Sequence, residues 1–237
     1  TPDGFLMHKY QPDRAIGSTW HPLVHGRRQE LAIQEDETAI VVFMMAEYYL
    51  HSGDKDYIAQ LMEEFIQPAC DFLVRFIDEE TRLTHASYDL WEEKFLSTTY
   101  TSAITYKALI EAVSLATELD SNYPGVNDWR KTAQMLKASS KLYFSEQTQS
   151  LIKGFLYADG ACKIDTVLDI SSFYGAWRFG YTDTVAVKQT LSRIESVLLD
   201  QSPSGGAPRY EHDAYFRSDP AYMGNPWFVT TLWLAQY

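Results

Sequence analysis

Two adjacent carboxylates, Glu92 and Glu93, follow an indole in the stretch Tyr88-Asp89-Leu90-Trp91-Glu92-Glu93. A Trp beside acidic side chains suits sugar recognition, because the ring face covers the C–H surface of a pyranose while carboxylates bind its hydroxyls. The same side chains suit cleavage of a glycosidic bond, where a carboxylic acid protonates the leaving oxygen. The alternative is a helix N-terminus, in which these acidic residues complement the helix dipole ahead of the Thr-rich segment 98–101.

The composition bounds the class of protein. With 237 residues, of which 46% are hydrophobic, the chain can form one large domain or two small ones around a sizeable core. The formal net charge of -12 argues against a nucleic-acid partner, which selects a basic face. It also disfavours anionic lipid and phosphorylated substrates, so a neutral substrate fits best. No apolar run approaches the ~18 residues of a membrane span. Compartment (cytoplasmic or secreted) and oligomeric state stay open.

Cysteine and histidine spacing predicts no metal site and no cofactor. Cys70 and Cys162 are far apart and lack metal-ligand spacing, so Cys70, on an apolar helical face, is expected to be a packed thiol. A single disulfide between the two stays open. The His residues form no zinc pair at helical spacing, and no acidic segment resembles a calcium loop. The sequence also contains no glycine-rich phosphate loop.

Apolar periodicity predicts a mainly helical chain after a loop-like segment over residues 1–35. A short strand is expected at 5–7. The loop also carries Trp20, His21 and His25, which are candidate site residues, although a structural role is favoured for each. A hairpin with the turn Asp159-Gly160 is expected within 151–165. Helices are predicted over 34–50, 54–77 with a bend at Pro68, 98–119, 127–144 with a capping Asn, 169 or 171 to 179, 182 or 183 to 199, and from Pro226 onward.

The predicted helices differ in how their apolar residues are distributed. The helix over 34–50 is apolar all round and is expected to be buried on all sides, whereas its neighbours are apolar on one side. This alternation predicts two concentric shells of helices. A closed ring of six helix pairs needs on the order of 400 residues, so the chain corresponds to roughly 60% of such a ring.

Three segments together carry a resemblance to a known family. They are Gln34-Glu35-Asp36-Glu37-Thr38-Ala39, the Asp-Leu-Trp-Glu-Glu segment at 89–93, and Arg209-Tyr210-Glu211-His212-Asp213-Ala214-Tyr215 followed by Gly224-Asn225-Pro226-Trp227. In order and spacing they resemble the glucoamylase family, glycoside hydrolase family 15. The resemblance covers nearly the whole chain.

The resemblance implies an all-α fold, the (α/α)6 barrel or six-hairpin toroid, of which 1–237 is one partial domain with a small β-hairpin insertion. It also implies an exo-acting enzyme that releases glucose from the non-reducing ends of α-glucans with inversion. By the family pattern, the general base is expected beyond Tyr237, and an Arg-Asp pair that grips the outer hydroxyls is expected before Thr1. The chain is therefore read as cut at both ends, and alone it is predicted to be inactive.

Residue roles follow from the same resemblance. Glu92 matches the general acid, Glu93 a neighbour that holds sugar hydroxyls, and Arg209 a substrate-binding arginine whose fork of donors orders hydroxyls or a carboxylate. The aromatic walls of the glucose pocket are matched by Trp91, Tyr215 and Trp227. We expect residues near 92, 209 and 227 to converge on one sugar-sized hollow.

Several alternatives stay open. The cleaved bond could be α-1,4 or α-1,6, and the substrate could be dextran or trehalose. The chain could instead be a non-catalytic, glucoamylase-like scaffold or sugar sensor. A third reading is a helical interaction protein in which Trp91, Tyr215 and Trp227 are dispersed core residues.

Overall fold

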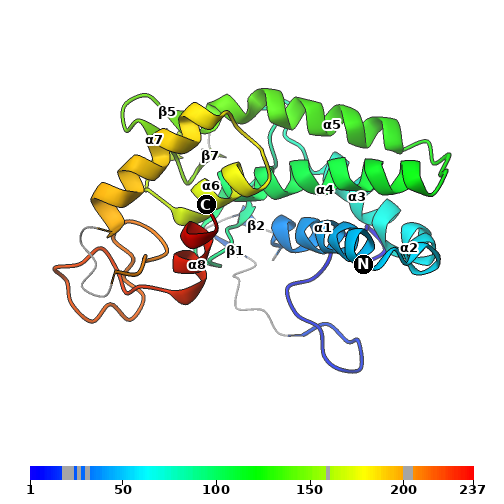
Figure 1. Cartoon of the computed structure of the whole chain (residues 1–237), viewed down its shortest axis with the longest axis horizontal. Helices are drawn as coiled ribbons and strands as arrows, with labels where there is room; N and C mark the ends of the chain where they lie inside the picture. Colours follow the sequence, from blue (N-terminus) through cyan, green and yellow to red (C-terminus); the bar gives the residue numbers. More distant parts are fainter. Residues whose placement is uncertain (18–23, 26–27, 30–32, 159–160, 200–204) are drawn as a thin grey trace. The chain divides into compact units, whose positions relative to one another are not determined.

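The computed structural model describes residues 1–17, 24–25, 28–29, 33–158, 161–199 and 205–237 (Figure 1). The chain divides into two compact units. The first unit contains residues 1–97 and 104–139, and the second contains 98–103 and 140–237. Each unit is described by itself, and the single domain expected over 1–237 stays a prediction.

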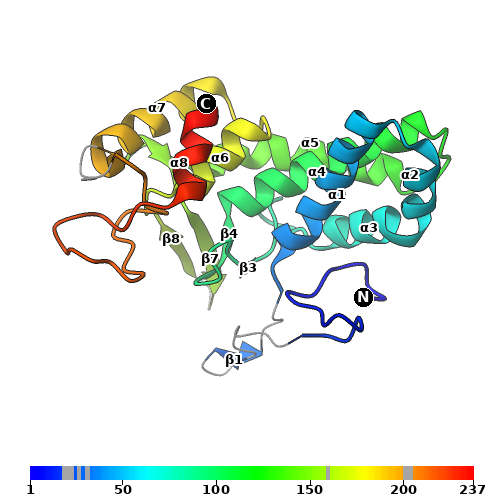
Figure 2. The ribbon, with the colours of Figure 1, turned by 60° about the horizontal axis from the view of Figure 1, so that its bottom comes forward.

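Helices build most of the first unit. They are α1 (Glu35–Ser52), α2 (Lys55–Leu61), a π-helical stretch (Met62–Ile66), α3 (Gln67–Arg75), α5 (Val126–Ser139) and most of α4 (Thr99–Glu118). α1 packs against α2 and α3, and α5 packs against α3. Within this unit, α4 and α5 run alongside each other in both views (Figures 1 and 2).

The first helix lies where the sequence predicts it, but its burial differs. Gly53, with φ 66, caps α1 in the left-handed conformation that glycine adopts most easily. Its buried apolar side chains are Ala39, Val42, Phe43 and Ala46. Met44 and Leu50 are 55% and 74% exposed, so the prediction of burial on all sides is wrong. α1 packs on α2 and α3 through one face, and apolar composition does not specify which face is covered.

Pro68 changes the helix type instead of interrupting the helix. Proline lacks an N–H, and its ring clashes with the carbonyl four residues earlier. The turn before Pro68 is π-helical, and Gln67 N–H bonds to Met62 C=O, five residues back. The wider turn accommodates proline while the chain stays helical from Lys55 to Arg75.

A buried indole joins α5 to α3. Trp129 on α5 is fully buried, and its Nε1 donates to Asp71 Oδ1 over 2.9 Å. α5 begins at Val126, so the prediction that an Asn caps it is wrong. Asn127 already lies inside the helix, where its side chain accepts a hydrogen bond from Arg130.

The N-terminal segment contains little regular structure. No strand forms at 5–7, and a single bridge pairs Tyr10 with Ile16. Two short strands, β1 (Val24–His25) and β2 (Arg28–Gln29), pair antiparallel. Trp20 and His21 lie outside the described residues, as does the side chain of His25, so the participation of these three residues in a site stays a prediction.

A short hairpin carries the acidic motif. β3 (Ser87–Tyr88) pairs antiparallel with β4 (Phe95–Thr98), and α4 follows at once, one residue from its predicted start. The four residues of β4 therefore separate the acidic pair from the helix, about 13 Å of extended chain. Because the helix dipole acts mainly within the first turn, the helix-terminus reading of Glu92 and Glu93 is wrong.

The second unit combines a hairpin with three helices. β7 (Gly154–Ala158) pairs with β8 (Ala161–Asp165), which confirms the predicted hairpin, and the turn at 159–160 lies outside the described residues. α6 (Ile170–Arg178) packs against α7 (Thr184–Ile194) and α8 (Phe228–Gln236), and α8 lies beside α6 in Figure 2. The elements are a 3₁₀ helix (Ser140–Tyr143), β5 (Phe144–Ser145), β6 (Ser150–Leu151), β7, β8, α6 (Ile170–Arg178), α7 (Thr184–Ile194), a π-helical stretch (Glu195–Leu199) and α8 (Phe228–Gln236).

Local signals place these helix ends. Asp169 and Asp183 cap α6 and α7 by accepting backbone N–H bonds, and Gly180 after α6 has φ 62, as the sequence predicts. The last helix departs from prediction. Trp227, with φ -114 and ψ 142, is the extended cap of α8, so Pro226 lies before the helix and not in its first turn.

Both cysteines are free thiols. Cys70 on α3 is fully buried, which confirms the predicted packed thiol, and burial raises its pKa well above the ordinary value. Cys162 is exposed on β8. Within the described ranges, no helix has the length and apolar character needed to cross a membrane.

Candidate active site

Asp89 organises the loop that carries the acidic pair. Its Oδ1 accepts the backbone N–H groups of Glu93 and Lys94 over 2.8 and 2.9 Å. Its own backbone accepts from Glu92 N–H and donates to Lys94 C=O, both over 2.8 Å. Because Asp89 is only 2% exposed, the loop is held by a buried carboxylate that fixes two of its amides, while the Asp89 carbonyl fixes a third.

The start of α1 docks on this hairpin. Tyr88 N–H donates to Ile33 C=O over 3.1 Å, and Gln34 Nε2 donates to Asp89 C=O over 3.1 Å. The partners are 55 residues apart in the Gln34 contact. The contact brings the acidic first turn of α1 next to the loop, which sequence spacing alone does not reveal.

Glu92 has an unusual backbone within this loop. Its φ is 61, the left-handed region that non-glycine residues rarely adopt, at a cost on the order of 1 kcal/mol or more. Its side chain is 28% exposed. Glu93 is exposed and Trp91 is partly exposed. Glu92 is thus half-buried yet open to a ligand, as a proton-donating acid requires.

An imidazole lies between Glu92 and a carboxyl of α1. His8 Nδ1 lies 2.9 Å from Glu37 Oε1, and His8 Nε2 lies 3.5 Å from Glu92 Oε2. The His8 side chain is 5% exposed. Burial raises the pKa of Glu37 and the Glu92 charge raises it further, whereas the hydrogen bond and charge of His8 lower it. The two carboxyl groups therefore lie near different nitrogens of the same imidazole ring.

A second carboxyl is enclosed behind the loop. Glu35 is fully buried, and its pKa is raised well above the ordinary value, first by burial and then by the charge of Asp36. Thr105 Oγ1 donates to Glu35 Oε1 over 3.4 Å. Burial of this kind favours the neutral form of a carboxyl over its charged form.

In the second unit, a buried ion pair holds the other candidate residues. Arg209 is 4% exposed, and its Nε and Nη2 donate to the two Asp213 oxygens, each over 2.8 Å. Asp213 Oδ1 also accepts Tyr215 N–H over 3.0 Å. The fork of Arg209 thus binds a carboxylate of the protein, and its predicted contact with substrate stays a prediction.

Aromatic rings surround the Arg209 guanidinium. Its carbon lies 5.0 Å from the ring centres of Tyr215 and Trp227 and 5.2 Å from that of Tyr210. The Tyr215 and Trp227 rings are 5.7 Å apart with an interplanar angle of 51°. Tyr215 is 50% exposed and Trp227 is partly exposed. These rings form one cluster with an open face, so the reading of dispersed core aromatics does not hold for this pair.

The Gly-Asn-Pro-Trp segment has a physical explanation in this cluster. A Cβ on Gly224 would lie 2.8 Å from Asp213 Cβ and 3.0 Å from Pro208 Cβ, so only glycine fits against the ion pair. Asn225 donates to Phe216 C=O over 2.6 Å and thereby secures the loop before it. Trp227 N–H donates to Ala207 C=O over 2.9 Å, which fixes the backbone that presents the indole.

A buried lysine connects the cluster to α6. Lys153 Nζ lies 3.2 Å from Asp169 Oδ2, with both side chains at most 2% exposed, and 4.4 Å from the centre of the Tyr210 ring. Ile170 N–H donates to Arg209 C=O over 3.0 Å. The backbone of Arg209 and Tyr210 is therefore held against the N-terminus of α6.

The structure groups the predicted site residues in two sets. Trp91, Glu92 and Glu93 share the hairpin loop of the first unit, whereas Arg209, Tyr215 and Trp227 cluster in the second. Convergence of the two sets on one hollow stays a prediction. Sequence reasoning missed His8, Glu37, Asp89 and Asp213. All but His8 lie inside the recognised segments, which was the available signal.

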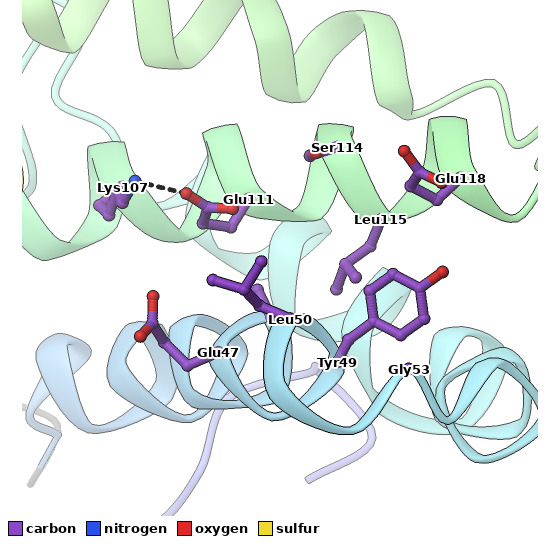
Figure 3. Close-up of a pocket in the computed structure, with 10 residues that line it drawn as sticks. Glu47, Tyr49, Leu50, Gly53, Lys107, Glu111, Ser114, Leu115 and Glu118 are labelled. Carbon is purple, nitrogen blue, oxygen red and sulfur yellow. Dashed lines mark ion pairs between the residues drawn. The ribbon is translucent and has the colours of Figure 1, made fainter.

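A hollow of about 500 Å³ between α1 and α4 lies elsewhere in the first unit (Figure 3). Its lining includes Glu47, Tyr49 and Leu50 of α1 and Lys107, Glu111 and Leu115 of α4. Glu47 lies ten residues beyond Glu37 on α1, about 15 Å along the axis. The hollow is thus distinct from the loop of Glu92. Among the described residues, no group of three His, Cys, Asp or Glu side chains is arranged to hold a metal ion.

Comparisons with known proteins cover nearly the whole chain. The model of the family "Glycosyl hydrolases family 15" matches residues 19–237. An uncharacterized glycosyl hydrolase of Methanocaldococcus jannaschii is 28% identical over 242 residues, which is 100% of this chain and 36% of that protein. Trehalase 2 of Sulfolobus acidocaldarius is 26% identical over 220 residues, which is 91% of this chain and 34% of that protein.

Solved structures agree in fold. The glucoamylase from Saccharomycopsis fibuligera superposes with a TM-score of 0.67 at 18% identity, covering 89% of this chain and 48% of that one. This likeness gives the fold class, a mostly helical glucoamylase-like (α/α)6 fold with a small β component. The chain spans about a third of the length of the curated relatives it matches.

Proposed function

This chain belongs to glycosyl hydrolases family 15, and we propose that it carries the general acid of an exo-acting, inverting α-glucosidase. The proposed substrate is an α-glucan or α-gluco-oligosaccharide, from whose non-reducing end glucose is released. The assignment of the acid rests on one observation. Glu92 stands at the tip of a loop fixed by Asp89, 28% exposed and in a left-handed backbone conformation.

The proposed chemistry follows from this placement. Glu92 in its acid form gives its proton to the glycosidic oxygen as the bond to the anomeric carbon breaks. In an inverting enzyme, a base then activates water on the opposite face of the sugar, about 6.5–9.5 Å from the acid. We assign no base among the described residues. Glu93, exposed beside the acid, is proposed to bind sugar hydroxyls.

The aromatic cluster supports a pyranose ligand. Tyr215 and Trp227 present ring faces beside a positive charge that Asp213 neutralises. Such a surface suits an uncharged sugar, because ring faces cover C–H groups and the cation is already paired. Arg209 is proposed to act mainly by fixing these two rings. Trp91, partly exposed beside the acid, is proposed as a third wall.

The test of the acid uses two substrates in the full-length protein. Glu92→Gln keeps the shape of the side chain but has no acidic proton, so kcat on maltose and isomaltose should fall about 10²–10⁴-fold. Hydrolysis of α-glucosyl fluoride should be retained, since fluoride leaves without protonation. Glu79→Gln, an exposed glutamate of the same unit, is the matched control. Full maltose activity in Glu92→Gln would remove Glu92 from the acid role.

The stereochemistry has its own measurement. Proton NMR of early product should show β-glucose appearing first from an α-linked substrate. Appearance of α-glucose first would refute the inverting mechanism while leaving the acid assignment untouched.

Trehalose is the second candidate substrate, because a named relative is a trehalase. Its α-linked bond needs the same acid, so the site chemistry does not separate the two activities. Rates on trehalose, maltose, isomaltose and dextran, measured side by side, decide between them. Sugar binding without hydrolysis of any of the four would favour the non-catalytic scaffold instead.

A further inference from the structure

The first residues of the chain are anchored to the helices of the first unit. Gly4 has φ 95, and a Cβ there would lie 2.0 Å from the Pro68 carbonyl oxygen, so the backbone passes α3 at a distance that only glycine permits. Arg75 Nη2 donates to Asp3 C=O over 2.8 Å. The segment is therefore fixed before it reaches the candidate site.

A further contact fixes the backbone next to the site. Leu6 N–H donates to Thr38 Oγ1 over 2.9 Å, and Thr38 is fully buried on α1. His8 follows two residues later and places its ring, 5% exposed, between α1 and the hairpin loop. The imidazole is thus presented by an anchored segment, which is what a side chain that orients another group needs.

Each nitrogen of the His8 ring lies near a different carboxyl group. Nδ1 lies 2.9 Å from Glu37 Oε1, so with a proton on Nδ1 the ring donates a hydrogen bond to Glu37, which sets the ring orientation. Nε2 then points at Glu92 Oε2, 3.5 Å away. Such contacts are often long in an unliganded site and tighten when substrate binds. The Glu92 side chain is 28% exposed, so it keeps surface for a ligand beside this contact.

We propose that His8 is a positioning residue that holds Glu92 through Oε2 while Oε1 faces the glycosidic oxygen, an inference that rests on the proposed function. With protons on both ring nitrogens, Nε2–H donates to Oε2 and Nδ1–H donates to Glu37. The Oε1 proton passes to the glycosidic oxygen, the bond to the anomeric carbon breaks, and His8 keeps both protons. Its contact with Glu92 thereby changes from a hydrogen bond between an imidazolium and a neutral carboxyl into an ion pair between an imidazolium and a carboxylate.

This change makes the contact stronger in the transition state than in the ground state. Only such differential interactions accelerate the chemical step. Glu37 completes the arrangement because its carboxylate holds the ring and balances its charge.

The experiment compares a substrate that needs the acid with one that does not, in the full-length protein. His8→Ala should lower kcat on maltose about 10–100-fold, as expected for a misplaced catalytic group, with little change in KM. Its kcat on α-glucosyl fluoride should stay within about threefold of the parent, because fluoride departs without a proton. An equal loss on both substrates, or no loss on either, overturns the proposal.

Two isosteric variants separate the contacts of the ring. His8→Gln places an amide donor near the Nε2 position, whereas His8→Asn keeps a donor near Nδ1 but does not reach Glu92. Gln should therefore restore more maltose activity than Asn, and the reverse order overturns the proposal. These variants also serve if the alanine variant does not fold. His85→Ala, an exposed histidine 3.9 Å from Asp78 in the same unit, is the matched control.

Glu92→Gln in the same assay distinguishes the two levels of inference. If Glu92→Gln leaves maltose hydrolysis intact, the proposed function fails, and the role of His8 fails with it. If Glu92→Gln loses maltose hydrolysis selectively and the His8 variants do not, only the role of His8 is overturned.

Discussion

Replacing Asp89 tests whether a buried carboxylate sets the geometry of the acid. Asp89→Ala removes the acceptor of two backbone N–H bonds, those of Glu93 and Lys94. Hydrogen bonds to a charged group contribute about 1.5–3 kcal/mol each. Because Glu93 is exposed and water replaces part of that bond, we expect the free energy of unfolding to fall by about 2–4 kcal/mol in total. Asp89→Asn keeps a neutral acceptor and should lose only about 1 kcal/mol.

The effect on turnover should exceed the effect on stability. The Asp89 bonds determine where Glu92 stands, and a displacement of about 1 Å at a reacting group costs on the order of 10²-fold in rate. We therefore expect kcat on maltose to fall by about that factor in Asp89→Ala at a temperature where the protein stays folded. Urea denaturation gives the stability, and glucose release gives kcat.

A matched control exists in the second unit. Asp183 Oδ1 also accepts two backbone N–H groups, from Val185 and Ala186, each over 2.9 Å, at the start of α7. Asp183→Ala should cost about 1 kcal/mol of stability as a lost helix cap, with kcat unchanged. If Asp89→Ala and Asp183→Ala affect kcat equally, the loop is not positioned by Asp89 and the reasoning fails.

Two further predictions concern stability. Gly224→Ala forces a Cβ to within 2.8 Å of Asp213 Cβ. The free energy of unfolding should therefore fall by about 1–3 kcal/mol, and Trp fluorescence should change. An unaltered melting temperature and fluorescence spectrum would contradict this prediction. Glu35 has a folded-state pKa raised by burial, so the folded protein binds its proton more tightly and stability falls as pH rises above the ordinary value of 4.5. Glu35→Gln should remove that decline in urea denaturation over pH 4.5 and upward, and parallel stability curves for both proteins would refute it.

Much of the fold follows from local signals. The ends of α1, α6 and α7 agree with prediction within a few residues, because Gly53, Asp169 and Asp183 act through bonds to nearby backbone. Two local predictions are wrong for a related reason. Asn127 and Pro226 are residue types favoured near helix starts, yet the chain placed the actual boundaries one or two residues away. Composition marks the vicinity of a boundary more reliably than the boundary itself.

The candidate site was predictable only in part. The cluster of Arg209, Tyr215 and Trp227 follows from segments close in sequence, and family resemblance identifies it. The His8 contacts join residues far apart in the chain, 29 residues in the case of Glu37. A lone histidine carries no signal of such a partner. Only the docking of the first segment on α1 and α3 reveals it.

The left-handed backbone at Glu92 has a consequence for engineering and for evolution. Glycine adopts this conformation without strain, so a selection of variants for thermal stability alone would favour replacing Glu92 with glycine. The substitution would delete the carboxyl that is proposed to act as the general acid. Homologous chains that have lost hydrolysis are therefore expected to carry glycine or asparagine at this position. The residue type at this position would then distinguish homologues that have lost the activity from those that keep it.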